Sequence, residues 1–567
     1  MPQENRATDR EPEVVEDTGS PSSEPSEPSP VSQEPAPAPA PPPFVPMHPA
    51  RAAAYMFASL VVALTQGLGM NLVTTNIVQI QGSIGATTNE ATWLVAAYMA
   101  PNVSLSLALI KIRAQYGLRN FAELSILGFV LACILNLFIS DLPSAIVVRF
   151  MSGIATAPMS TLGFLYMLES FPPEKKLSIG LPLALTNISL GAPVARLISP
   201  ALVDIAGWHG VTILEVALAM IGFCLVYLLP LAPQPRAKVI ERLDIVSYLL
   251  IATGFGATAV ALVLGRLYWW FEAPWLGVLF ALATVCITVA VIIELNRKNP
   301  LLDIRWLASP AVLHFAGTLL LFRIVLSEQT TGASGFFQVL GLLNDQTKTL
   351  YWVILVATVA GGLVCAMVLK PGREPAIHVV ALTLLTVGAF MDSGATNLTR
   401  PEQMYLSQSL IAFAGALFLP PALLTGLMSA LKNGPNYILS FIIVFLTTQS
   451  LGGLLGSAVF GTFITIREKF HSSILVEHLA LTDPLVAQRI AQFGGVYARV
   501  LTDKALLNAE GVALLAQQAT REANVLAYND AFLMIAIISA TALLALLIHI
   551  AILAVRTRAI TASTANA

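Results

Sequence analysis

The sequence has few charged residues. Asp, Glu, Lys and Arg together make up 11% of its 567 residues, whereas about 25% is usual for soluble globular domains. This scarcity excludes an ordinary soluble protein of this length. The formal net charge of −2 says nothing about nucleic acid. We expect a small organic substrate, protons and the lipid bilayer as partners, and no nucleic acid.

Cysteine is also rare, and familiar catalytic motifs are absent. All four cysteines lie inside apolar runs, where they are typical of small hydrophobic side chains rather than of a disulfide framework or a metal cluster. The sequence contains no P-loop, HExxH, CxxC or GxSxG motif. We therefore expect no enzyme activity, no cofactor and no metal ion.

Long apolar runs fill most of the chain, from about residue 52 to about residue 557. A run of about 20 apolar residues can cross the roughly 30 Å core of a bilayer as a helix. The pattern predicts an all-α integral membrane protein with about fourteen transmembrane helices. We expect them near 52–76, 90–112, 120–140, 144–168, 178–203, 209–231, 244–266, 275–294, 310–339, 350–369, 375–393, 404–430, 437–464 and 530–556.

The helix count suggests a division into two halves. We expect a six-helix bundle over 51–232, cytoplasmic loops and two extra helices over 233–307, and a second six-helix bundle over 308–557. Residues 1–50 are dense in Pro, Glu and Ser, which predicts a disordered tail, either a plain flexible one or one that docks a partner. Residues 558–567 form a second short tail.

Lys and Arg are concentrated in alternate loops, among them 111–119, 172–176, 235–242 and 370–374. The positive-inside rule makes these loops cytoplasmic, which places both termini inside the cell. We expect the protein in the inner (plasma) membrane. One long loop, residues 466–528, then lies outside. Its partial helical periodicity predicts a helical cap or hairpin that is either a spacer or a docking surface.

Five of the charged residues within the expected spans are candidates for a functional role: Arg149, Arg196, Glu215, Arg323 and Glu328. Each costs roughly 2.5–3.5 kcal/mol at a helix centre, so each should face a cavity or a partner. Because a spacing of five residues turns about 140° around a helix, Arg323 and Glu328 are not expected to neutralise one another.

Three of these residues, Glu328, Arg149 and Arg196, each allow a functional and a structural interpretation. Glu328 is a candidate proton carrier, or one half of an ion pair at a helix end. Arg149 is a candidate for coupling, or a clamp on main-chain carbonyl groups. Arg196 is a candidate for the substrate cavity, or a donor to carbonyl groups that nearby prolines leave free.

Uncharged polar residues on the spans give further candidates for a substrate cavity. They are Gln66, Asn71, Asn76, Asn187 and Gln338, to be taken together with Arg196. The run GGLLGSAVFG, residues 452–461, has the small-residue spacing of a close-packed helix face.

Several stretches resemble the fourteen-helix drug:proton antiporters of the major facilitator superfamily, the EmrB/QacA type. IQGSIGATTNEATWLVAAYMAPN (80–102) resembles the family's first outer loop and second helix, and Arg149 to Gly153 fits the RxxxG of its motif B. The D-x-x-x-W spacing from Asp204 to Trp208 is similar as well. The resemblance implies the major facilitator fold, proton-driven export of organic compounds, and a coupling role for Arg149.

The chain departs from the family pattern at three places. The first helix has Gly69 near the place of the usual acid, and motif C is reduced to LGAPVARLISP. The gating motif A keeps only Arg113, Gly117 and Arg119. We therefore expect Glu328, with Arg323 beside it, to take over proton coupling.

These expectations lead to three hypotheses. The first is proton-coupled efflux of amphiphilic or aromatic compounds, anionic ones included. The second is an uncoupled or differently coupled organic-anion exporter, and the third is a non-transporting sensor or scaffold. The candidate charges are three arginines and two acids, which predicts a cavity of positive potential suited to an anionic substrate. Loss of Arg149 should then weaken anion export more than cation export. By resemblance, the outer loop is expected to meet a periplasmic HlyD-like adaptor joined to an outer-membrane channel.

Overall fold

The computed structural model describes residues 47–232, 238–297, 300–433 and 435–565. The regular structure of these residues is helical throughout, with no strand among them. Residues 1–46 of the expected N-terminal tail therefore lie outside the described residues. Part of the loop 235–242 and the last two residues of the C-terminal tail lie outside them as well.

Local sequence signals set the starts of many helices. Thr87 and Glu90 form a capping box at the start of one helix, and Asp141 and Ser144 form another. A proline in the first turn begins several more, because proline needs no N–H partner there. These capping residues and prolines lie between the apolar runs of the sequence.

The first half contains six spans. Its helices are α1 (Pro49–Thr75), α2 (Ile77–Ser83), α3 (Thr88–Tyr116), α4 (Leu118–Leu135), η1 (Asn136–Phe138), α5 (Leu142–Glu169), α6 (Pro173–Lys175), η2 (Lys176–Gly180), α7 (Leu181–Ser189) and α8 (Gly191–Leu228). α8 covers the end of the fifth span and the whole of the sixth. The chain changes direction between these two spans at Gly207, where φ of +56° suits a residue without a side chain.

The two extra helices are α9 (Arg242–Tyr268) and α10 (Pro274–Leu295). They pack on each other, and α9 also lies against α3 and α17. At one end, Lys111 of α3 and Arg297 each lie 2.7 Å from Oδ1 of Asp244, and Arg297 also binds Glu294. At the other end, the Trp270 indole donates to Thr462 of α17 across 2.9 Å.

The second half contains the remaining six spans. Its helices are α11 (Ile304–Leu307), α12 (Pro310–Ser327), η3 (Glu328–Ala333), α13 (Ser334–Val339), α14 (Lys348–Val368), α15 (Glu374–Asp392), η4 (Pro401–Met404), α16 (Tyr405–Asn433), α17 (Pro435–Glu477), α18 (Pro484–Gly495) and α19 (Lys504–Ala565). The described helices include fourteen that are long and apolar enough to cross a membrane. The predicted number of spans is confirmed.

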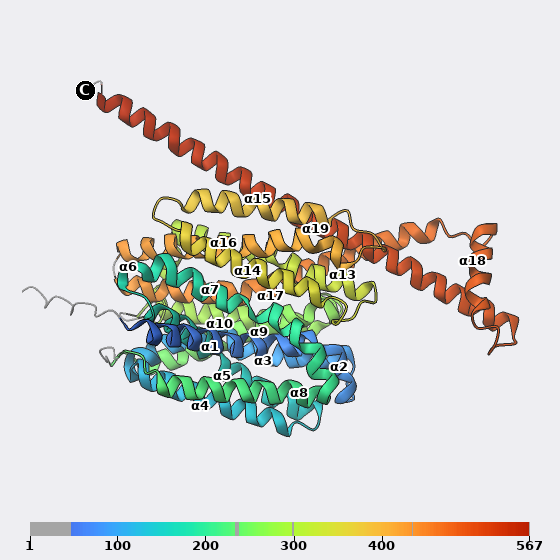
Figure 1. Ribbon diagram of the computed structural model, residues 1–567, viewed down its shortest axis with the longest axis horizontal. Coiled ribbons are helices and arrows are strands. Elements are labelled where there is room, and N and C mark those ends of the chain that lie inside the picture. Colours follow the sequence, from blue (N-terminus) through green and yellow to red (C-terminus); the bar gives the residue numbers. More distant parts are fainter. Residues whose placement is uncertain (1–46, 233–237, 298–299, 434, 566–567) are drawn as a thin grey trace, which may run out of the picture. The chain divides into compact units, whose positions relative to one another are not determined.

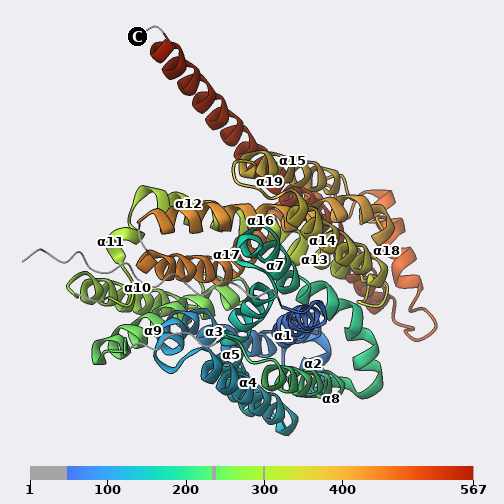
Figure 2. The ribbon, with the colours of Figure 1, turned by 60° about the vertical axis from the view of Figure 1, so that its left-hand side comes forward.

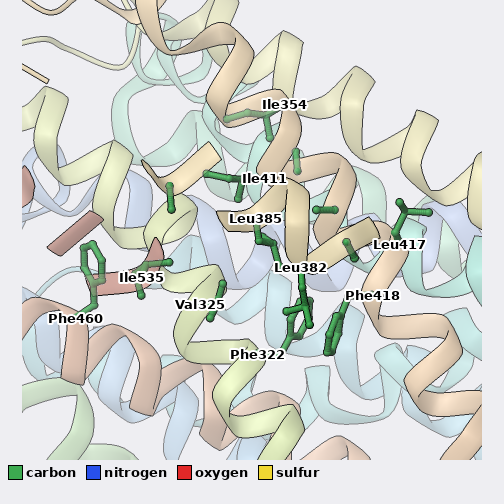
Figure 3. Close-up of a cluster of buried hydrophobic side chains, with 14 of the residues drawn as sticks. Phe322, Val325, Ile354, Leu382, Leu385, Ile411, Leu417, Phe418, Phe460 and Ile535 are labelled. Carbon is green, nitrogen blue, oxygen red and sulfur yellow. The ribbon is translucent and has the colours of Figure 1, made fainter. Parts of the chain in front are cut away.

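The second half is held by an apolar core between α12, α14, α15 and α16, shown in Figure 3. Phe322 and Phe418 stack there with ring centroids 4.1 Å apart, and Leu382, Leu385 and Ile411 fill the space beside them. Large apolar side chains are also exposed over many helices, which fits a surface that faces lipid.

The segment expected outside the membrane is largely helical. The end of α17, then α18, then the start of α19 extend past the neighbouring helices (Figures 1 and 2). We call residues 466–528 the hairpin. α18 lies against the start of α19, where a side chain on Gly494 or Gly511 would collide with main-chain oxygen atoms of the other helix. A helical hairpin was expected in this part of the chain.

Candidate functional site

Glu328 is completely buried in the second half of the protein, with 0% of its surface exposed. It begins η3, a π-helical turn between α12 and α13. A π-helical turn widens the helix and changes the direction of its side chains, and such turns are frequent at functional sites. The strongest candidate from the sequence therefore lies in the interior, at an irregular turn.

Two further residues complete the site around Glu328. Asp392 is the last residue of α15, and Gln408 lies in the first turn of α16. The Gln408 amide donates to Oε1 of Glu328 across 2.8 Å and to Oδ2 of Asp392 across 2.7 Å. Ser407 also donates to Asp392. We call Glu328, Asp392 and Gln408 the carboxyl pair site.

The two carboxyl groups of this site also interact with each other directly. Two buried carboxylates in contact repel strongly, so such a pair is stable when one proton is shared between them. Oε2 of Glu328 has no donor among the described residues, and a proton on either carboxyl supplies one. The arrangement can therefore take up and release a proton.

A hollow of about 260 Å³ lies beside Asp392. Polar residues line it from the turn after α15 and from η4, including Thr396, Thr399 and Gln403. Asp392 itself is only 3% exposed. The hollow therefore adjoins the carboxyl pair site at Asp392.

The small polar residues after Glu328 serve close packing. Thr331 donates to Ser457 of α17, and Gln329 donates to the main chain of Gln408. A side chain on Gly332 would collide with two phenylalanine rings, and one on Gly335 would collide with Tyr528. These residues let η3 lie directly against α17 and α19.

Arg323 is separated from Glu328, as the five-residue spacing predicted. No ion pair joins them among the described residues. Arg323 lies instead against the glycine face of α17, where a side chain on Gly453 would meet its guanidinium and one on Gly456 its carbonyl oxygen. The close-packed face predicted from the glycine spacing is confirmed.

Arg149 is buried in the first half, with 2% of its surface exposed. It donates to the main-chain carbonyl of Gly69 across 2.9 Å, and its guanidinium lies 4.5 Å from the centre of the Tyr98 ring. Gly69 is the residue near which the family's first-helix acid was expected. A main-chain dipole therefore occupies the place of a carboxylate in the hydrogen bonding of Arg149.

Arg196 occupies the boundary between the two halves. It lies on α8, and its guanidinium is 5.1 Å from the centre of the Tyr351 ring on α14. It makes no ion pair with another described residue. Its charge is held by an aromatic face, and it is half-buried.

The uncharged cavity candidates have varied surroundings. Asn71 donates to Gly67 within its own helix, Asn187 donates to Ser59 across 3.3 Å, and buried Asn76 accepts a bond from Ser199. Gln66 is half-buried and Gln338 is exposed. The structure does not gather these five residues around the carboxyl pair site.

The remnant of the gating motif lies at the junction of α3 and α4. Gly117 has φ of +84° and ends α3, where its N–H donates to Arg113. Arg119 is exposed and pairs with Glu123 across 2.8 Å. Lys111 of α3, two residues before Arg113, joins the ionic cluster with Asp244.

Sequence reasoning missed Asp392 and Gln408. Asp392 comes at the end of an apolar run, in AFMDSGATN, where a helix end facing water was the natural interpretation. Gln408 is a single polar residue near the start of the next run. An acid at a span end followed by a glutamine early in the next span was the available signal.

Comparison with known proteins places this chain in a family. Residues 59–466 match the family model described as Major Facilitator Superfamily. The chain is 25% identical to the multidrug export protein EmrB of Haemophilus influenzae over 516 residues, which cover 85% of this chain and 93% of that protein. It is 23% identical to the fatty acid resistance protein FarB of Neisseria gonorrhoeae over 512 residues, or 86% of this chain and 94% of that protein.

A solved structure shows the same fold. The human organic anion transporter MFSD10 superimposes with a TM-score of 0.51 at 13% sequence identity, over 87% of this chain and 100% of that chain. The resemblance to the EmrB type that the sequence suggested is confirmed by the curated relatives. With fourteen apolar spans and a family match over most of its length, the chain belongs to the Major Facilitator Superfamily and is a membrane transporter rather than an enzyme.

Proposed function

We propose that this protein exports amphiphilic or aromatic organic compounds across the inner (plasma) membrane in exchange for protons. The carboxyl pair site supports the proposal best, since Gln408 holds two buried acids, Glu328 and Asp392, against each other. A shared proton is the natural occupant of such a pair. Proton occupancy then depends on pH on the side to which the site is open.

The pair also gives the proton a way to influence helix packing. Glu328, Asp392 and Gln408 come from η3, α15 and α16. With the proton bound, the three elements pack around a site with one negative charge. Without it, two charges repel in a medium of low dielectric, which favours a state in which water enters between the helices. Uptake and release of the proton thus bias two arrangements of the second half.

The basic loops orient this cycle in the membrane. α15 follows the basic loop 370–374, so its end at Asp392 faces the outside if those loops are cytoplasmic. The hollow beside Asp392 then opens outward. In that orientation protons enter from the outside while substrate leaves, and both termini lie inside the cell.

The substrate class is argued from Arg196 and from the relatives. Arg196 is half-buried at the boundary of the two halves and carries a charge that no described acid neutralises. An anionic head group suits it, and the apolar helices around it suit a hydrocarbon or aromatic body. One relative is named for fatty acid resistance and another for multidrug export, which fits amphiphiles of this kind.

The hairpin is proposed to dock a second protein. Its exposed side chains include large apolar ones, such as Leu485 and Val500, which are 74% and 81% exposed. Large apolar side chains grouped outside the membrane are typical of contact surfaces. We assign this surface to a periplasmic HlyD-like adaptor that leads to an outer-membrane channel.

Transport by the purified protein in liposomes tests the function. An imposed pH gradient should drive uphill movement of an amphiphilic anion such as dodecanoate. Glu328→Gln or Asp392→Asn should abolish uphill movement and leave substrate exchange. Asp345→Asn, a change at an exposed acid in the same half, is the matched control and should behave as the original protein.

The same assay separates the alternatives. Transport that ignores the pH gradient would show an uncoupled exporter, which the absence of any acid in α1 would then explain. No transport of any probe would favour a sensor or scaffold. Arg196→Gln should reduce movement of dodecanoate more than that of ethidium, a lipophilic cation of aromatic character.

A further inference from the structure

Another buried acid lies in the first half of the protein, apart from the carboxyl pair site. Glu215 is on α8, within the sixth span, and is 4% exposed. Its side chain forms no ion pair within 4 Å and no hydrogen bond with another described residue, and Oε1 is buried without a donor. Such a carboxyl differs from the structural acids of this protein.

Glu294 shows what a structural acid looks like here. It is equally buried, but it accepts from Arg297 across 3.0 Å and from the main-chain N–H groups of Leu301 and Leu302. Those donors compensate a negative charge on its carboxylate through hydrogen bonds. Glu215 has no such donors, so a negative charge on it is not compensated by hydrogen bonds.

The titratable and charged groups around Glu215 are few. Arg149 of α5 acts on it electrostatically, and Tyr98 of α3 and Cys133 of α4 share the same surroundings. α1 contributes no charge there, only the carbonyl group of Gly69. On α14, Tyr351 is engaged by Arg196 instead. Arg149 is therefore the cation that faces Glu215.

Arg149 has a donor that is not used among the described residues. One of its nitrogen atoms bonds the Gly69 carbonyl, and its Nε is buried with no acceptor among the described residues. A carbonyl oxygen is a weaker partner for a guanidinium than a carboxylate is. If Glu215 loses its proton, the guanidinium can turn from the carbonyl to the new carboxylate.

We propose that Glu215 is a second proton-binding site, which exchanges its proton as Arg149 moves between the Gly69 carbonyl and the Glu215 carboxylate. The proposal rests on the proton-coupled transport proposed above. In the protonated state the O–H of Glu215 is intact and Arg149 binds Gly69. On release, the O–H bond breaks, the proton passes to water, and the electron pair remains on Glu215 as the charge that attracts Arg149.

The site gives each half of the transporter its own proton-binding acid. The second half has the Glu328 and Asp392 pair, and the first half has Glu215. One transport cycle then moves two protons for each substrate. At zero membrane potential, the limiting substrate ratio across the membrane depends on the number of protons moved.

The limiting ratio provides the transport test. With a pH difference of about one unit, loss of one coupled proton lowers the ratio about tenfold, because each pH unit per proton is a factor of ten. We expect this decrease for Glu215→Gln with dodecanoate as the probe. Glu294→Gln removes an acid of similar burial and should change the amount or stability of the protein but not the ratio.

Infrared spectroscopy tests the proton directly, without transport. The difference between the original protein and Glu215→Gln should contain the band of a protonated buried carboxyl, which disappears reversibly as the pH is raised. In Arg149→Met the band should persist to higher pH, because the cation that favours the carboxylate is gone. A structural role for Arg149 would not move that pH.

The outcomes separate the two proposals. An unchanged limiting ratio in Glu215→Gln, in a protein whose Glu328→Gln variant loses uphill transport, overturns the Glu215 proposal. So does a difference spectrum without a titrating carboxyl band. An original protein that ignores the pH gradient overturns proton-coupled transport, and the infrared band then decides alone whether Glu215 binds a proton.

Discussion

The side-chain amide of Gln408 donates a 2.8 Å hydrogen bond to Glu328, a residue 80 positions earlier in the chain. The other acceptor of that amide is Asp392, at 2.7 Å. An amide has two N–H bonds in one plane, and here both are directed at carboxyl groups. Gln408 therefore sets the distance and the orientation of the two acids.

Replacement of Gln408 should destabilise the protein. Gln408→Met keeps most of the volume but leaves two buried carboxyl groups without their donor, which should cost about 1–3 kcal/mol in unfolding free energy. Thermal unfolding in detergent measures the loss. Gln338→Met changes an exposed glutamine in the same half and should have little effect; an equal loss in both variants would contradict the bridging role.

Two glycines of α1 should respond differently to the same substitution. A Cβ atom on Gly67 would lie 2.7 Å from the Cα atom of Gly191 on α8, whereas one on Gly69 would meet nothing within 4 Å. Main chain cannot move aside cheaply, so Gly67→Ala should separate the helices and lower the unfolding temperature. Gly69→Ala should be tolerated, with a gain of up to about 1 kcal/mol from helix propensity. Equal unfolding temperatures would show that α1 and α8 are not in such close contact.

The ionic cluster between α3, α9 and α10 should contribute strongly to stability. Asp244 accepts from Lys111 and Arg297, and all three side chains are largely buried. Asp244→Asn leaves two buried cations short of a partner, which should cost about 3–5 kcal/mol. Unfolding measured at low and high salt should show the same loss, since buried charges are poorly screened. Glu272→Gln, at an exposed acid, is the control.

The hairpin should open when its glycine contact is blocked. A Cβ atom on Gly511 would lie 2.2 Å from the carbonyl oxygen of Ile490, whereas one on Gly495 would meet nothing within 4 Å. Gly511→Ala should therefore expose the segment between α18 and α19 to limited proteolysis. Gly495→Ala should be cut as slowly as the original protein. Faster cleavage in both variants would indicate a hairpin that is already loose.

Much of the fold could be predicted from the sequence, because a membrane span needs only a run of apolar residues of sufficient length. The fourteen spans followed from that requirement. The buried position of Glu328 followed from the same reasoning, since a charge in lipid must turn inward. The five-residue spacing also predicted that Arg323 would not neutralise it, and no ion pair between them occurs among the described residues.

The partners of these charges could not be predicted in the same way. Asp392 lies beside Glu328 because three helical elements pack together. The sequence of one span does not indicate which other span it will contact. The π-helical turn at η3 adds to the difficulty, because it changes the direction of side chains relative to a regular helix. Gly332 and Gly335, which follow the start of this turn, lack side chains where Phe460 and Tyr528 lie directly against them.

One continuous helix joins the hairpin to the neighbourhood of Asp392. α19 runs for 62 residues from Lys504 to Ala565 and packs along α15 and α17. Along the way Asn529 donates to the carbonyl group of Ala395, three residues after Asp392. A displacement of the hairpin can therefore be passed along α19 to the turn that begins after Asp392. A protein bound to the hairpin would thus be able to change the rate of proton release from the carboxyl pair site.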